Sequence, residues 1–114
     1  MLTLDALKEI GVKPEEGLSR CMNNEQFYLS LVKRVAGDAG FQKLKDAIEA
    51  GDLETGFEAA HALKGVLGNL ALTPIYNPVS EMTELLRAGK DADYADYLAG
   101  ILRQRETLLA LCDD

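Results

Sequence analysis

The only histidine of the chain, His61, is the residue best suited to nucleophilic chemistry. A histidine imidazole titrates near neutral pH, so its neutral form is available to attack an electrophile. Lys64 follows three residues later, and on a helix that spacing puts its ammonium group one turn away, within reach of a phosphoryl oxygen on the imidazole. Taken alone, however, a histidine and a lysine on a helix surface are ordinary solvated side chains.

Two glycines follow His61 on the same side of the expected helix. At about 100° per residue, Gly65 and Gly68 fall within about 60° of the histidine. Each glycine costs about 1 kcal/mol relative to alanine inside a helix, so a compensating role is expected. One explanation is that they clear the surface so that a partner's cleft can reach the imidazole. The alternative is that Gly68 and Asn69 form a helix C-cap, but we favour the first explanation because Leu70 continues the apolar stripe.

The opposite side of this helix is apolar and is expected to face the core. Its members lie roughly 100° to 200° from His61 and are Ala59, Ala60, Leu63, Leu67 and Leu70. The histidine side also carries Glu54, Phe57, Glu58, Lys64 and Leu72. Asp52 is a suitable N-cap, and we expect the helix to continue to about Leu72, because the residue before Pro74 is pushed out of the helical region. His61 should therefore be exposed to solvent.

The rest of the chain also has helical periodicity, and no alternation typical of a strand is sustained. We expect a short helix that Gly11 closes, a helical turn starting at Pro14, and longer helices over residues 24–37, 41–50, 77–89 with Asn77 as the cap, and 93–111. Residues 24–50 could also form one helix bent at Gly37 and Gly40, or Asp38 could cap the second of two. Short polar connections between these helices predict an all-α, up-and-down four-helix bundle with a short N-terminal helical appendage.

Composition narrows the class of protein. A chain of 114 residues is expected to form one domain over residues 1–114. A formal net charge of −7 argues against nucleic acid or an anionic membrane as partner. The N-terminus has no signal-peptide pattern and no apolar run is long enough to span a bilayer, so we expect a cytoplasmic protein. Cys21 and Cys112 are expected to be free thiols, and no metal site is expected.

One stretch of sequence resembles a known family. Ala60-His61-Ala62-Leu63-Lys64-Gly65, followed by Gly68-Asn69-Leu70, is similar to the signature of histidine-containing phosphotransfer (HPt) domains. A second segment, with Gly17, Leu18, Arg20, Phe27, Tyr28 and Leu31, resembles the family's entry into its first bundle helix, so the resemblance covers roughly residues 10–90. The chain departs from the pattern at Val66, Ala71, Pro74 and Pro78.

The resemblance implies a role for each residue of the site. His61 would be the phosphorylated nucleophile, attacking through Nε2. Lys64 would stabilise the phosphoryl charge and Gly65 would provide steric clearance. The remaining residues on this face, Phe57, Glu58, Gly68 and Asn69, would contact the partner, with Glu58 also a candidate to hold the second ring nitrogen.

The resemblance also implies the partners. These would be response-regulator receiver domains, which supply the aspartate, the divalent metal and a lysine, so this chain would need no cofactor. A hybrid sensor histidine kinase is a further candidate partner. We expect a monomeric phosphoryl carrier rather than an enzyme that turns over alone.

Two alternatives remain open from the sequence. One is a helical docking module that binds a receiver or another partner without being phosphorylated. The other is the phosphoacceptor domain of a chemotaxis-type histidine kinase, whose kinase domain would lie elsewhere because the sequence has no nucleotide-binding motif. Only a phosphoryl acceptor needs His61 itself, so one substitution separates an acceptor from a docking module.

Overall fold

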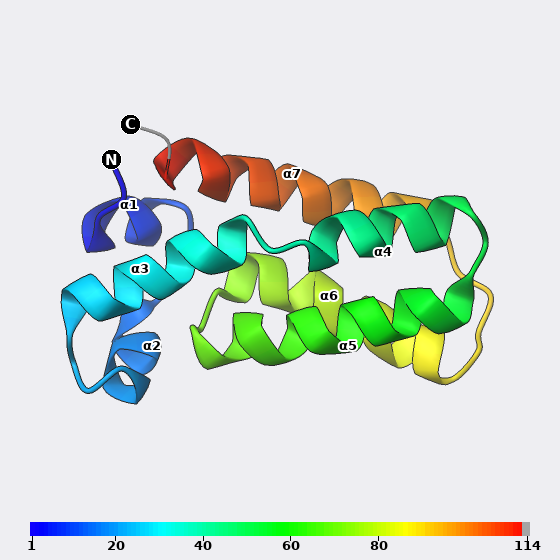
Figure 1. Cartoon of the computed structure of the whole chain (residues 1–114), viewed down its shortest axis with the longest axis horizontal. Coiled ribbons are helices and arrows are strands. Elements are labelled where there is room, and N and C mark those ends of the chain that lie inside the picture. Colours follow the sequence, from blue (N-terminus) through cyan, green and yellow to red (C-terminus); the bar gives the residue numbers. More distant parts are fainter. Residues whose placement is uncertain (113–114) are drawn as a thin grey trace.

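The computed structural model describes residues 1–112, and this part of the chain is all-helical, as predicted (Figure 1). It contains seven helices: α1 (Leu4–Glu9), α2 (Pro14–Arg20), α3 (Glu25–Ala36), α4 (Gly40–Glu49), α5 (Leu53–Asn69), α6 (Thr73–Arg87) and α7 (Tyr94–Cys112). None of these helices is long and apolar enough to cross a membrane.

Four of the helices form a closed ring, in which each helix packs against two others. α4 packs against α5, α5 against α6, α6 against α7, and α7 returns to contact α4 as well as α3. The molecule is elongated, with extents of 40 × 26 × 20 Å, and α3 and α4 follow one another along its length (Figure 1). α1 and α2 lie at the end where α7 finishes. The N-terminal appendage consists of two short helices, which correspond to the short helix expected before Gly11 and to the helical turn expected from Pro14.

The break between α3 and α4 is produced by a glycine, an aspartate and a second glycine. Gly37 is the C-cap of α3 and Asp38 follows it, with its Oδ1 accepting a hydrogen bond of 2.7 Å from the backbone N–H of Gly40. A β-carbon on Gly40 would lie 3.1 Å from Cδ2 of Leu63, so glycine allows α4 to approach α5 closely. The two helices are therefore separate. The N-cap of α4 is Ala39 and not Asp38, although the Asp38 carboxylate accepts from the first backbone N–H of the helix.

The boundary between α5 and α6 differs from the prediction. α5 ends at Asn69 and not near Leu72; Leu70 is the C-cap, and Ala71 has a left-handed φ of 57°. Leu70 is 2% exposed because the turn buries it, and not because the helix continues. Leu72, which helical periodicity placed on the side of His61, is instead 1% exposed, because the chain has already left the helix. In the sequence, Leu70 therefore extends an apolar stripe that the helix itself does not continue.

The predicted start of α6 near Asn77 is wrong, and Asn77 is not its cap. The helix begins at Thr73, with Pro74 in its first turn and Pro78 inside it. Proline is favoured in the first turn, where its missing N–H has no helical partner to lose. Pro78 removes the hydrogen bond to the carbonyl four residues earlier, and its ring crowds that carbonyl. The buried residues of α6 offset this cost.

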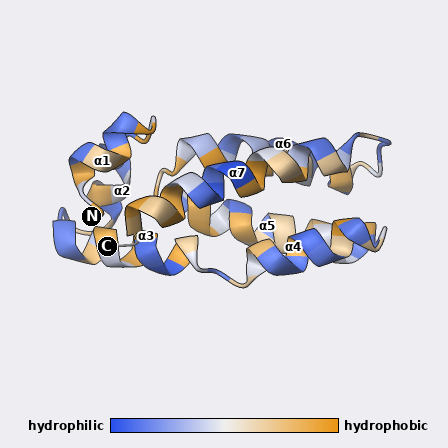
Figure 2. Cartoon of the chain, turned by 90° about the horizontal axis from the view of Figure 1, so that it is seen from above, coloured by the Kyte–Doolittle hydropathy of each residue, from blue (hydrophilic) through white to orange (hydrophobic). Residues whose placement is uncertain are grey.

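The core runs the length of the ring. Every helix carries both hydrophilic and hydrophobic residues (Figure 2). The largest fully buried side chains come from all the long helices, from α1 and from the turn before α6, and include Leu7, Tyr28, Phe41, Leu44, Leu63, Leu67, Leu72, Met82, Ile101 and Leu108. Phe27, which shares the apolar spacing of α3, is instead 50% exposed. Both cysteines are free thiols, as predicted, with Cys21 buried and Cys112 partly buried.

Candidate functional site

His61 lies in the middle of α5 and is exposed to solvent, as predicted. The opposite side of the helix is buried: Leu63 is 1% exposed, Leu67 0% and Leu70 2%. Asp52 caps the N-terminus, since its Oδ1 accepts a hydrogen bond of 3.1 Å from the backbone N–H of Thr55 and its Oδ2 accepts one of 2.7 Å from the Thr55 hydroxyl. These hydrogen bonds, that of the hydroxyl first, lower the pKa of Asp52.

The imidazole of His61 is oriented by an aromatic neighbour. The ring of Phe57, one turn earlier on α5, stacks on it with centroids 5.6 Å apart and planes inclined by 18°. The guanidinium carbon of Arg87, from α6, lies 5.2 Å from the centroid of the same Phe57 ring, a cation–π distance. Phe57 is therefore held between the histidine and an arginine that the sequence had not indicated.

Lys64 also contacts α6. Its Nζ lies 3.3 Å from Oε1 of Glu84, and Oε2 of Glu84 lies 3.4 Å from Nε of Arg87. The Lys64 side chain is only 27% exposed. Lys64 is thus more than a solvated surface lysine, because α6 holds it beside the histidine.

Most of the site residues line one open depression. It is lined by His61, Lys64, Gly65, Gly68 and Asn69 of α5, together with Arg20 of α2 and Tyr76 of α6. Most of the site residues predicted on α5 therefore share one surface. Phe57 does not line this depression but stacks on the ring of His61, and Glu58 lines a different depression.

The two glycines of this surface have different surroundings. A β-carbon on Gly65 would meet no atom within 4 Å, so the space above it is open to solvent and to a partner. A β-carbon on Gly68 would lie 3.0 Å from Cε2 of Tyr76. Gly68 therefore has a packing role within the chain, in contrast to the clearing role that we had expected for both glycines.

Arg20 and Tyr28 close the C-terminal end of α5. Nη1 of Arg20 donates to the carbonyls of Gly68 and Asn69, at 2.9 and 3.1 Å, and the Tyr28 hydroxyl donates to the carbonyl of Leu70 at 2.8 Å. The last carbonyls of a helix have no partners within it. That of Gly68 also accepts from the backbone N–H of Ala71, whereas Arg20 and Tyr28 satisfy the carbonyls of Asn69 and Leu70, which would otherwise need water. Burial is the main cause that raises the pKa of Tyr28 to about 12.

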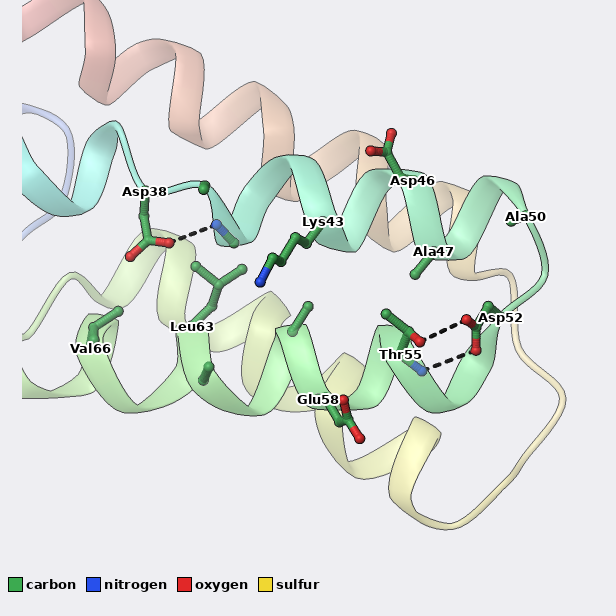
Figure 3. Close-up of a pocket in the computed structure, with 14 residues that line it drawn as sticks. Asp38, Lys43, Asp46, Ala47, Ala50, Asp52, Thr55, Glu58, Leu63 and Val66 are labelled. Atoms are coloured by element: carbon green, nitrogen blue, oxygen red, sulfur yellow. Dashed lines mark hydrogen bonds between the residues drawn. The ribbon is translucent and has the colours of Figure 1, made fainter.

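Glu58 lines a second depression, between α4 and α5 (Figure 3). Small and apolar residues form part of its lining, including Ala47, Ala59, Ala62, Leu63 and Val66, and its charged residues include Asp38, Lys43, Asp46 and Asp52. Within residues 1–112, no hydrogen bond joins Glu58 to His61, so a role for Glu58 at the second ring nitrogen stays a prediction.

Arg20, Tyr76, Glu84 and Arg87 are the site residues that the periodicity of α5 did not indicate. The sequence indicated Arg20 only as part of the segment that resembles the family's entry into its first bundle helix. Glu84 and Arg87 are three residues apart on the polar side of α6, a spacing that indicates an ion pair within a helix but not its partners on α5. In the described residues, no group of three or more His, Cys, Asp or Glu side chains could hold a metal ion.

Comparison with protein families places this chain in one of them. The model of the Hpt domain family matches residues 35–113, which is more than half of the chain. No significant match was found among curated proteins or solved structures. The chain belongs to the Hpt domain family, whose members carry out histidine phosphotransfer in two-component signalling and interact with response-regulator receiver domains. The match extends beyond residue 90 into α7 but excludes α1, α2 and most of α3, and therefore Arg20 and Tyr28.

Proposed function

We propose that this protein is a phosphorelay carrier that accepts a phosphoryl group on His61 from the aspartyl phosphate of one receiver domain and passes it to another. The observation that carries the proposal is the exposed His61 at the centre of α5, with open space above Gly65 on the same face. The family match supports phosphotransfer as the chemistry. The ring of α4 to α7, with α3 extending it, would be the four-helix framework that the resemblance implies.

The transfer itself needs one nucleophilic nitrogen. The unprotonated ring nitrogen of neutral His61, Nε2 by family resemblance, would attack the phosphorus in line. The N–P bond forms as the bond from phosphorus to the aspartyl oxygen breaks, and the aspartate leaves as a carboxylate. The proton on the other ring nitrogen does not take part in this exchange. Passing the group to the next receiver is the same exchange in reverse.

The chain's own residues would position the imidazole and balance charge. Stacking on Phe57 would restrict the rotation of the His61 ring and so help to position the attacking nitrogen. Lys64 lies one turn away and would approach the phosphoryl oxygens as negative charge gathers there. The receiver would bring the divalent metal, so the carrier would not turn over without a partner.

The test is the His61→Gln variant, incubated with a phosphorylated receiver. We expect the acid-labile label to be lost, receiver binding to remain, and the free energy of unfolding to change by less than about 0.5 kcal/mol, since the side chain is exposed. Label retained by the variant would contradict the proposal. A wild-type chain that binds receivers but never takes up label would support the docking module instead.

A further inference from the structure

Glu84 contacts two cations beside the site, Lys64 and Arg87. Its Oε1 lies 3.3 Å from Nζ of Lys64 on α5, and its Oε2 lies 3.4 Å from Nε of Arg87, one turn further along α6. Arg87 in turn lies over Phe57, on which His61 stacks. Both residues of α5 that flank His61 along the helix are thus contacted from α6.

Lys64 therefore already has an anionic partner before any phosphoryl group arrives. Lys64 and His61 line the same depression, and Lys64 carries one ammonium group on a flexible stem. A phosphoryl group on His61 would bring a second anion, with more charge, to the same surface. The ammonium then has two candidate partners, Glu84 and the phosphoryl group.

We propose, on the basis of the function proposed above, that Glu84 competes with the phosphoryl group for Lys64, so that phosphorylation of His61 exchanges one ion pair for another. Glu84 is then a positioning residue that acts through Lys64. Its carboxylate lowers the share of the chain that is phosphorylated at equilibrium with a receiver.

The second oxygen of Glu84 makes this exchange feasible. When Lys64 turns to the phosphoryl group, Oε2 keeps its contact with Arg87, so the carboxylate is not left without a cation. Both partners of the pair are partly exposed, at 27% for Lys64 and 55% for Glu84, so the pair is weak enough to be given up. Its loss should change the equilibrium modestly, by about 1.5- to 5-fold.

The experiment measures how label divides between the chain and one receiver at equilibrium. Four proteins are compared: wild type, Glu84→Gln, Lys64→Ala and the double variant. We expect Glu84→Gln to raise the ratio of phosphorylated chain to phosphorylated receiver about 1.5- to 5-fold, and to leave it unchanged when Lys64 is already alanine. This dependence on Lys64 distinguishes competition from direct repulsion between Glu84 and the phosphoryl group, which would act equally in both backgrounds.

Glu81→Gln is the matched control. Glu81 is exposed, lies one turn before Glu84 on α6, and forms no ion pair in the described part of the chain. The control removes the same charge from the same helix, and we expect a ratio close to that of wild type. Thermal unfolding of each variant checks that it is folded.

The outcomes separate this inference from the proposed function. A Glu84→Gln ratio equal to or below that of wild type, an equal rise in the Lys64→Ala background, or an equal rise in Glu81→Gln would overturn the competition while leaving His61 as the acceptor. A wild-type chain that takes up no label would overturn the proposed function and the competition together.

Discussion

Gly65 and Gly68 follow His61 by one and two turns of α5, and a β-carbon would meet different surroundings at each. At Gly68 the ring of Tyr76 occupies the space, so the glycine is explained by contacts within the chain. At Gly65 nothing lies within 4 Å, so no internal contact explains why a residue that weakens the helix stands there. The approach of a partner is therefore the reason that we propose for Gly65.

Gly65→Leu should therefore separate stability from function. We expect the free energy of unfolding to rise by up to about 1 kcal/mol, because leucine favours a helix and meets no neighbouring atom at its β-carbon. Transfer from a phosphorylated receiver should nevertheless slow, because the new side chain stands beside the imidazole. Chemical denaturation and a transfer assay with one receiver measure the two effects.

Gly100→Leu is the control for this comparison. Gly100 lies inside α7, has the same open space at its β-carbon, and does not line the depression around His61. It should gain stability in the same way and transfer at the parental rate. A Gly65→Leu variant that accepts phosphate as fast as Gly100→Leu would refute the steric role of Gly65.

Single residues on one helix were predictable from the sequence, whereas contacts between helices were not. The exposure of His61 and the burial of Leu63 follow from a period of 3.6 residues, which fixes the sides of a helix without reference to its neighbours. The ion pair between Lys64 and Glu84 depends on how α5 and α6 lie against each other. Charged residues suit any solvated helix surface, so the pattern alone could not assign such partners.

At the scale of the helix, α5 is held at both ends by side chains. Asp52 satisfies backbone and side-chain donors of Thr55 at the first turn, while Arg20 and Tyr28 satisfy the carbonyls at the last. The cap at the start comes from the residue next to the helix, which is why it was predictable. The donors at the end come from α2 and α3, which are distant in sequence.

Arg20→Ala should test the closure at the end of α5. The variant loses two hydrogen bonds to the carbonyls of Gly68 and Asn69, and the side chain is 45% exposed, so water replaces part of them. We expect a loss of about 1 kcal/mol in the free energy of unfolding, measured by chemical denaturation. Hydrogen exchange should also become faster in the last turn of α5.

Arg34→Ala provides the matched control, since Arg34 is an exposed arginine of α3 without a hydrogen bond or ion pair in the described residues. It removes the same charge from a chain whose net charge is −7, and stability should change by less than about 0.5 kcal/mol. Equal losses for the two variants would show that charge, and not the cap, explains the effect of Arg20→Ala.

Helix boundaries were predictable where a local cap sets them and not where a turn is buried. Asn24 and Gly37 bound α3 as expected, because a side-chain cap and a glycine act within a few residues. The turn between α5 and α6 buries its leucines, and its left-handed residue is Ala71, where a glycine would have marked the end of the helix. Because this turn is hydrophobic and contains no glycine, the predicted helix extended beyond the true end of α5.

At the scale of the whole molecule, Tyr28 connects α2, α3 and α5. It is fully buried, and its hydroxyl donates to the carbonyl of Leu70 at the end of α5. Gly17 of α2 packs against the Tyr28 ring, and a β-carbon there would also lie 2.7 Å from the Leu70 carbonyl oxygen. The residues before the Hpt match are thus joined to the end of the helix that carries His61 through Tyr28 as well as through Arg20.

This burial gives the protein a dependence on alkaline pH with a definite sign. The pKa of Tyr28 is about 12 in the folded protein, raised from 10.0 chiefly by burial. Because the unfolded chain loses the Tyr28 proton first, the contribution to stability is complete below pH 10 and declines as the pH rises through 12. Tyr28→Phe should cost about 1 kcal/mol at neutral pH, for the lost hydrogen bond. The gap between wild type and Tyr28→Phe should then narrow above pH 10 and change sign before pH 12, because only wild type can lose this proton.

Denaturation with urea at a series of pH values from 7 to 12 measures that gap directly. Lysines and the other tyrosines titrate in both proteins, so their contributions largely cancel in the difference. A gap that stays constant to pH 12 would show that the Tyr28 phenol titrates alike in the folded and unfolded chains. In that case the hydroxyl would have to be accessible to water, and the contact between Tyr28 and Leu70 would not seal the junction of α2, α3 and α5.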